Sequence, residues 1–259
     1  MKGIDRYTIK WVAMISMLID HLGYALIHQT NTFTTVIGTI CYAIGRLAFP
    51  LFVYLLVDGF IRTRSKERFF LRLLIFALIS EVPYDLAQTG RILNIGSQNV
   101  MWTLMLGFAF MWFADLVLDK DFFLNVKWIG IAMMILLGVI VTFTAITLHT
   151  DYGAYGVTAI IIQYLFVRLS KKLPDVWGIR TDLFGFMLVI ILLVYMKSGE
   201  IFAAPAVLLI WNYYRKAIKK MPKLIGYAFY PAHLLVIGLI SIALNHVTGG
   251  LVGEPFAWM

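Results

Sequence analysis

The sequence predicts an all-α fold, a polytopic integral membrane helical bundle of about nine transmembrane helices. Of the 259 residues, 61% are hydrophobic and only 14% are charged, and the mean hydropathy is +0.85, which is outside the range of soluble domains. Apolar runs of about twenty residues, the length of a helix that crosses a bilayer, recur along the chain. These runs lack the alternating pattern of an outer-membrane β-barrel. We expect a single domain over residues 1–259.

Nine apolar runs are candidate membrane spans. They lie at 9–29, 34–61, 69–88, 97–118, 126–147, 153–169, 182–197, 201–214 and 224–245. The runs at 182–197 and 201–214 are short for a hydrocarbon core of about 30 Å, so 182–214 is either two spans, a shallow hairpin or one interrupted element. The first run resembles a signal peptide, but Asp20 and His21 interrupt it and no small-residue cleavage site follows, which favours a retained span.

Lysine and arginine residues concentrate in alternate loops between these runs. The rich segments are 2–10, 62–72, 120–127, 168–180 and 215–223, whereas the other side has little more than Arg91 and Lys197. The positive-inside rule therefore places the N-terminus in the cytoplasm and predicts a multi-pass protein of the cytoplasmic (inner) membrane. The net charge of +8 comes from clusters beside apolar runs, where membrane lipids are the expected partners and nucleic acid is not.

The first run carries a cation at its start and an acid–imidazole pair deep inside. Lys10 and His21 fall on one helical face, about three turns apart. His21 is either a hydrogen-bonded packing residue or a general base that takes a proton from an amine or hydroxyl. Asp20 stabilises a cationic imidazole or, because neighbouring positions diverge by about 100°, pairs with a cation on another span. We expect His21 and Asp20 to be catalytic.

Arg46 lies inside the second run, four residues before Pro50. A proline lacks the N–H that would bond to the carbonyl of residue 46, so polar backbone is freed beside the guanidinium. One interpretation is a structural ion pair with Asp20 or Glu81. The other is a role in anchoring a phosphate or stabilising an oxyanion, which suits a planar, permanently charged group.

Glu81 and Asp85 are one turn apart on the third run, with Pro83 between them. Two carboxylates at this depth bind a cationic acceptor, relay a proton or pair with Arg46, and the sequence leaves these alternatives open. We expect both residues to contribute to substrate binding.

Four further polar residues are candidates for the acceptor site. Asn99 and Asp151, in Asp151-Tyr152-Gly153, are expected near an outer mouth, although capping and turn chemistry explain Asp151 as well. Tyr230 and His233 lie one turn apart, and His233 is either a packing histidine or a participant in catalysis.

Metal and nucleotide chemistry have weak support in the sequence. The chain contains no H-E-x-x-H and no closely spaced His/Cys cluster, so no metal is expected. It also contains no G-x-S-x-G and no phosphate-binding loop, which disfavours a serine hydrolase or an ATP-driven protein.

Over most of its length the chain resembles the TraX family, membrane proteins associated with N-acetylation of conjugative pilin. The matching motifs are Ile9-Lys10-x-x-Ala13-x-x-x-Met17-x-x-Asp20-His21, Gly45-Arg46-x-Ala48-Phe49-Pro50-Leu51-Phe52, Asp151-Tyr152-Gly153 and Phe229-Tyr230-x-x-His233-Leu234. The basic residue, ten intervening positions and histidine also look like the first-helix motif of the broader transmembrane acyltransferases.

The resemblance implies an acyl donor such as acetyl-CoA at the cytoplasmic face and an acceptor at the outer face. On this pattern Lys10 contacts donor phosphate or orients the thioester, and His21 deprotonates the acceptor or carries the acyl group briefly. From the chemistry of its guanidinium, Arg46 is expected to assist donor binding. The acceptor is a peptide, polysaccharide or lipid, and either N- or O-acetylation fits.

The leading hypothesis is therefore a membrane-embedded acetyl-CoA-dependent acyltransferase. A proton-coupled transporter is an alternative from a different class, because a layer of His, Asp, Glu and Arg beside broken helices also suits proton relay. A non-catalytic envelope assembly factor is the third.

Overall fold

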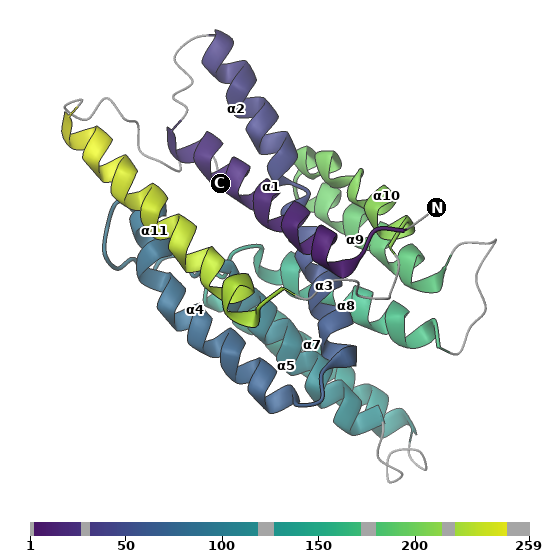
Figure 1. The fold of residues 1–259 in the computed structure, drawn as a ribbon. Coiled ribbons are helices and arrows are strands. Elements are labelled where there is room, and N and C mark those ends of the chain that lie inside the picture. The colour runs from purple at the N-terminus through teal and green to yellow at the C-terminus, as the bar shows by residue number, and fades with distance from the viewer. Residues whose placement is uncertain (1–2, 27–31, 119–126, 172–179, 214–220, 248–259) are drawn as a thin grey trace. The chain divides into compact units, whose positions relative to one another are not determined.

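The structure is a computed structural model that describes residues 3–26, 32–118, 127–171, 180–213 and 221–247 (Figure 1). Within these ranges the regular elements are helices, and the only β-type pairings are two isolated bridges. The all-α prediction is confirmed. The chain divides into two compact units, one built from residues 1–52, 78–95 and 194–259 and the other from residues 53–77 and 96–193. Each is described on its own.

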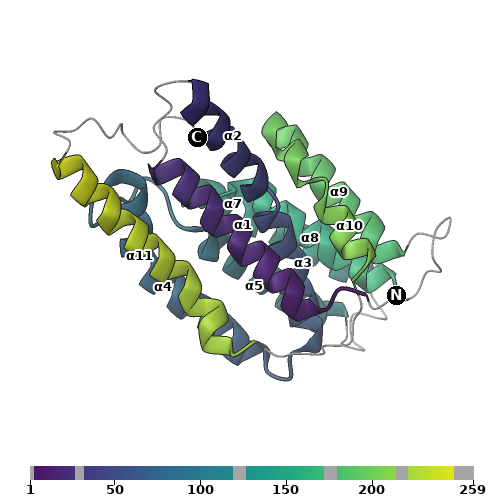
Figure 2. The ribbon, with the colours of Figure 1, turned by 45° about the horizontal axis from the view of Figure 1, so that its top comes forward.

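The first unit has α1 (Arg6–Leu26) at its centre. It also contains α2 (Thr32–Gly45), the second half of α4 (Lys66–Thr89), η1 (Ser198–Ala203), α10 (Ala206–Trp211) and α11 (Lys223–Val247). α1 packs against both α2 and α11, as both ribbon views show (Figures 1 and 2). α2 also packs against η1. Segments from the two ends of the chain are therefore brought together on α1.

Local chemistry explains where α1 begins and how closely α2 approaches it. The Asp5 carboxylate caps the helix by accepting hydrogen bonds from the backbone N–H and the hydroxyl of Thr8, at 2.9 and 2.7 Å. Gly23 of α1 lies directly against Cys41 of α2. A side chain at this glycine would overlap the neighbouring helix, so the small residue permits a close helix–helix contact.

The second unit is formed by α5 (Val100–Leu118), α7 (Lys127–Thr147), α8 (Gly153–Leu169), most of α9 (Thr181–Met196), the first half of α4 and the main part of α3 (Ala48–Arg62). α5, α7 and α8 pack against one another. Aromatic side chains fill the interior: Phe60 makes edge-to-face contacts with Phe108 and Tyr164, at centroid distances of 5.1 and 5.8 Å.

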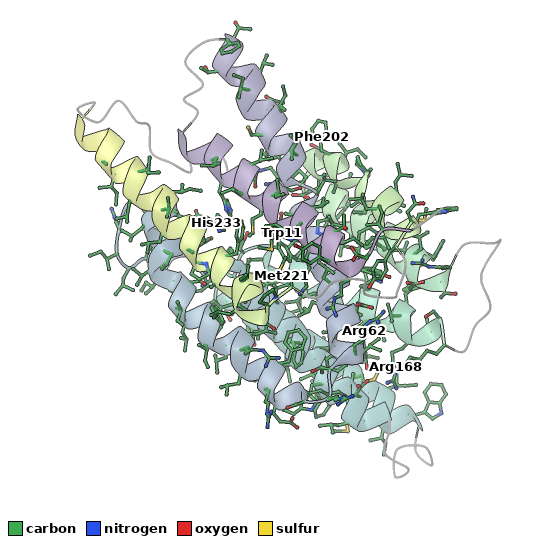
Figure 3. The ribbon with its side chains drawn as sticks, viewed as in Figure 1. Trp11, Arg62, Arg168, Phe202, Met221 and His233 are labelled. Carbon is green, nitrogen blue, oxygen red and sulfur yellow. The ribbon has the colours of Figure 1, made fainter. Side chains whose placement is uncertain are left out.

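Asp115 joins three helices of this second unit at their ends. Its carboxylate accepts hydrogen bonds from Tyr164, at 2.5 Å, and from Arg168, at 2.7 Å, and it also pairs with Lys66. Figure 3 labels Arg168 near the end of α8. These contacts link α4, α5 and α8 near their ends. Because the two cations are partly exposed, each ion pair adds little net stability.

Four stretches of the described residues are long and apolar enough to cross a membrane: Thr32–Arg62, Val100–Val117, Trp128–Thr147 and Leu224–Ala243. The predicted count of nine spans stays a prediction, as does the orientation of the N-terminus.

Two predicted spans differ in detail from the structure. The run at 34–61 is two helices, because α2 ends at Gly45 and α3 begins at Ala48. This break fits the expected effect of Pro50 on the carbonyl of Arg46. The run at 201–214 contains only the end of η1 and the six-residue α10, so within the described residues it is an interrupted element.

Candidate functional site

The candidate site lies in the first unit, where α1 and α11 bring two histidines together. Nδ1 of His21 lies 2.8 Å from Nε2 of His233, although 212 positions separate the residues in sequence. The far side of the His233 ring is held by its own helix, because Nδ1 lies 2.7 Å from the carbonyl oxygen of Phe229. Figure 3 labels His233 on α11. His21 is half-buried, whereas His233 is buried, with 8% of its surface exposed.

The neighbouring residue Asp20 faces α2 instead of α11. Its carboxylate accepts a hydrogen bond from a terminal nitrogen of Arg46 at 2.6 Å. The other terminal nitrogen of Arg46 donates to Glu200 of η1 at 2.9 Å. Arg46 is 7% exposed and Glu200 is fully buried. The predicted pairing of Asp20 with a cation on another span is thus confirmed, and Arg46 holds α1 and η1 together.

A tyrosine and a lysine complete this charged group. The Arg46 guanidinium lies 4.4 Å from the ring centre of Tyr42, and the Lys197 ammonium lies 5.6 Å from the same ring. Two carboxylates, Asp20 and Glu200, are therefore accompanied by two cations. We call Asp20, Arg46, Glu200 and Lys197 the charge cluster. Its formal charge is zero, with Lys197 exposed and Arg46 and Glu200 buried, and this balance lowers the cost of burying the inner ions.

The remaining predicted residues of the first unit lie on α1, on α11 and on the second half of α4. Lys10 lies on α1 and is half-buried, and Tyr230 approaches His233 edge-on, with a centroid distance of 5.8 Å. Glu81 and Asp85 lie on the second half of α4. Asp85 is 2% exposed and accepts a hydrogen bond from the backbone N–H of Asn94 at 2.7 Å. Donor and substrate binding by these residues stay predictions.

Asn99 and Asp151 belong to the second unit. Asn99 caps α5, because its side-chain oxygen accepts the N–H of Met101 at 3.0 Å, and its amide donates to the carbonyl of Ala77 at 2.8 Å. Asp151 donates its backbone N–H to the carbonyl of Gln98 at 2.8 Å. The cap at Asn99 was not predicted, and Asp151 precedes Tyr152, the N-cap residue of α8, which makes no side-chain cap hydrogen bond. The acceptor role predicted for both residues stays a prediction.

Sequence reasoning did not find Glu200, Tyr42 or Lys197. Glu200 follows a short apolar run, and nothing local marks it as the partner of Arg46, 154 positions away. One indirect signal exists. A buried arginine needs compensating negative charge, and Glu200 is a carboxylate between two apolar helices.

The arrangement combines an imidazole pair, one ring buried and the other half-buried, with a charge cluster whose member on α1, Asp20, directly precedes His21. Imidazole is suited to general-base or nucleophilic catalysis, and the adjacent ion pairs fix the rotation and depth of α1. Among the residues that the structure describes, no group of three His, Cys, Asp or Glu side chains is placed to hold a metal ion.

These features define an all-helical membrane protein with polar groups concentrated on its first helix. The family model described as "TraX protein" matches residues 5–241. The chain belongs to the TraX family, so the resemblance inferred from its motifs is confirmed.

A curated relative gives a second comparison. The chain is 24% identical, over 253 residues, to the "Probable fimbrial assembly protein FimC, serogroup H1" of Dichelobacter nodosus. The similarity covers 89% of this chain and 93% of the relative. No solved structure matches the chain.

Proposed function

We propose that the protein is an acyltransferase of the cytoplasmic membrane that moves an acetyl group from cytoplasmic acetyl-CoA to an amine or hydroxyl acceptor at the outer face. The observation that carries this proposal is the His21–His233 pair, because it holds the imidazole that we propose as the base on the helix that also bears Lys10. Membership of the TraX family, whose name is linked to pilin, supports a peptide of an envelope appendage as the acceptor, and envelope polymers and lipids remain candidates.

The reaction needs a base, a donor site and a leaving group. The acceptor nitrogen or oxygen attacks the thioester carbonyl carbon while His21 takes the proton, the carbon–sulfur bond breaks, and His21 returns the proton to the CoA thiolate. In a second route, the imidazole attacks first and an acetyl-histidine is then cleaved by the acceptor. Both routes use the same histidine and give acetylated acceptor and free CoA.

Lys10 and Arg46 have different parts in this proposal. Lys10 lies about three turns before His21 on α1, where a cation meets the phosphate groups of the donor or orients the thioester. Both terminal nitrogens of Arg46 are engaged by carboxylates. Arg46 therefore acts mainly by holding Asp20, and through it the neighbouring His21, in position.

Purified protein in nanodiscs, incubated with labelled acetyl-CoA and an envelope extract, tests the proposal. The wild type is expected to release CoA and label an acceptor, and His21→Ala is expected to lower the rate at least about 100-fold, because general-base catalysis contributes this much. The matched control is His149→Asn, since His149 is exposed and its backbone has the left-handed φ of 49° that asparagine tolerates.

Two other outcomes would replace the proposal. Accumulation of an unmodified solute by proteoliposomes, without release of CoA, would identify a proton-coupled transporter. The name of the Dichelobacter relative favours a non-catalytic assembly factor as the second candidate. In that case, His21→Ala would retain assembly of the appendage in cells, and no CoA would be released by the wild type.

A further inference from the structure

The hydrogen bonds around His233 determine which of its ring nitrogens carries a proton. A carbonyl oxygen can only accept, so the contact of 2.7 Å between Nδ1 of His233 and the carbonyl of Phe229 requires a hydrogen on Nδ1. A neutral imidazole has one N–H, and Nε2 of His233 is therefore an acceptor. The nitrogen that faces it, Nδ1 of His21, must then be the donor of the contact of 2.8 Å.

The same sequence of bonds assigns the remaining nitrogen of His21. With its hydrogen on Nδ1, neutral His21 has a lone pair on Nε2. The planes of the two imidazoles differ by only 15° and their centroids are 5.0 Å apart. The centroid distance exceeds the N–N distance by about the sum of the two ring radii. This is expected when the two nitrogens point at each other along the line that joins the ring centres. The contact is thus an in-plane hydrogen bond and not a face-to-face stack.

Residues of α11 prepare His233 for this role. The spacing of four residues places the carbonyl of Phe229 one turn before the His233 ring on the same helix face. The Phe229 ring lies against the His233 ring, with a centroid distance of 4.9 Å, and Tyr230 packs against it edge-on. The imidazole is therefore fixed by aromatic packing and by a hydrogen bond to its own helix before it meets His21.

We propose that His233 is a positioning residue that fixes the tautomer of His21, so that Nε2 of His21 is the reactive nitrogen. The use of Nε2 as the base rests on the proposed acyl transfer, whereas the tautomer follows from the two hydrogen bonds alone. The Nε2 lone pair takes the proton of the acceptor, and the resulting imidazolium keeps its Nδ1–H bond to His233. When the carbon–sulfur bond of the thioester has broken, the same Nε2–H protonates the CoA thiolate.

The tautomer is measured directly by ¹⁵N NMR of histidine-labelled protein in nanodiscs, with the His21 signals identified by their loss in His21→Ala. The wild type is expected to show a protonated Nδ1 and an unprotonated Nε2. In His233→Gln the amide oxygen replaces the acceptor and the pattern is expected to persist. In His233→Phe the ring volume remains without an acceptor, and His21 is expected to lose its single tautomer. A protonated Nε2 on His21 in the wild type would overturn the proposal.

Kinetics of the same variants provide the second readout. For His233→Phe, kcat is expected to fall severalfold with an unchanged KM for acetyl-CoA, because the base is then in the wrong tautomer for most of the time. His233→Gln should restore most of kcat. Equal losses in both variants, at equal thermal stability, would contradict a tautomer effect. If the wild type releases no CoA, the acyl transfer fails, and the NMR result still decides the role of His233.

Discussion

At the scale of single residues, Arg46 is the group whose surroundings constrain the site most. It is almost fully buried, and its two terminal nitrogens reach carboxylates on α1 and η1. A buried ion pair adds little net stability compared with an apolar replacement of the whole group, but the removal of one partner leaves an uncompensated charge. The charge cluster therefore acts as a specific connection that fixes Asp20, and with it the register of α1.

Replacement of Arg46 by methionine tests this connection. The variant leaves the buried Glu200 and the half-buried Asp20 without their shared partner, so we expect a loss of about 3–5 kcal/mol in the free energy of unfolding. The exposed Arg91→Met is the matched control and should change little. Denaturant unfolding in detergent measures both.

The pairing can be separated from simple loss of bulk by a double-mutant cycle. Asp20→Asn combined with Arg46→Met should cost less than the sum of the two single changes, because the Asp20 carboxylate that Arg46→Met alone would leave unpaired is then absent, while Glu200 loses its partner in both variants. Strict additivity would mean that the two side chains do not stabilise each other.

Sequence reasoning could reach part of this site. It predicted that His21 belongs to the site and gave Asp20 as one of two candidate partners of Arg46, because charged groups inside an apolar run are costly unless they are paired or functional. It could not identify Glu200 or the contact between His21 and His233. Those contacts join residues 154 and 212 positions apart, and no local pattern encodes which faces of distant helices meet.

At the scale of elements, glycine allows the helices around the site to approach closely. Gly45, the last residue of α2, lies directly against the carboxylate of Asp20, and Gly199 of η1 lies against the hydroxyl of Tyr42. A Cβ at either position would meet atoms of the neighbouring segment. The charge cluster is thus assembled where backbones pass each other with little space.

The effect of one methyl group on this approach is a second stability test. Gly45→Ala would push the Asp20 carboxylate aside, and overpacking of this kind costs about 1–3 kcal/mol. In Gly138→Ala on α7 the new Cβ would lie 3.6 Å from Phe110, an ordinary contact, so this control should be neutral or slightly stabilising. Equal unfolding midpoints for both variants would contradict the tight contact.

The sequence predicted the type of nearly every element and some of the irregularities. Pro50 indicated freed backbone at Arg46, and the structure has its break there, between α2 and α3. The shortness of the run at 201–214 left its form open, and α10 is only six residues long. Hydropathy could not decide this case, because it measures length and composition and cannot detect a 3₁₀ turn inside an apolar run.

At the scale of the whole molecule, composition alone predicted an all-helical membrane protein, and the described residues agree, because their regular elements are helices and four stretches are apolar enough to cross a membrane. The arrangement of basic segments gives an expected orientation with the N-terminus in the cytoplasm. In the proposed reaction acetyl-CoA binds from the cytoplasm and the acceptor is outside, so this orientation sets the direction in which the acetyl group moves. The count of spans could not be predicted equally well, since short and interrupted apolar helices satisfy the same composition rule as full spans.

Transfer of an acetyl group across the membrane is the central claim, and inside-out membrane vesicles test it most directly. The vesicles expose the cytoplasmic face, and they receive acetyl-CoA with one isotope in the acetyl group and another in the CoA moiety. We expect the acetyl label to become covalently bound to material inside the vesicles while the CoA label stays outside, with neither label transferred by His21→Ala. Entry of both labels together, or equal labelling by the wild type and His21→Ala, would contradict the account.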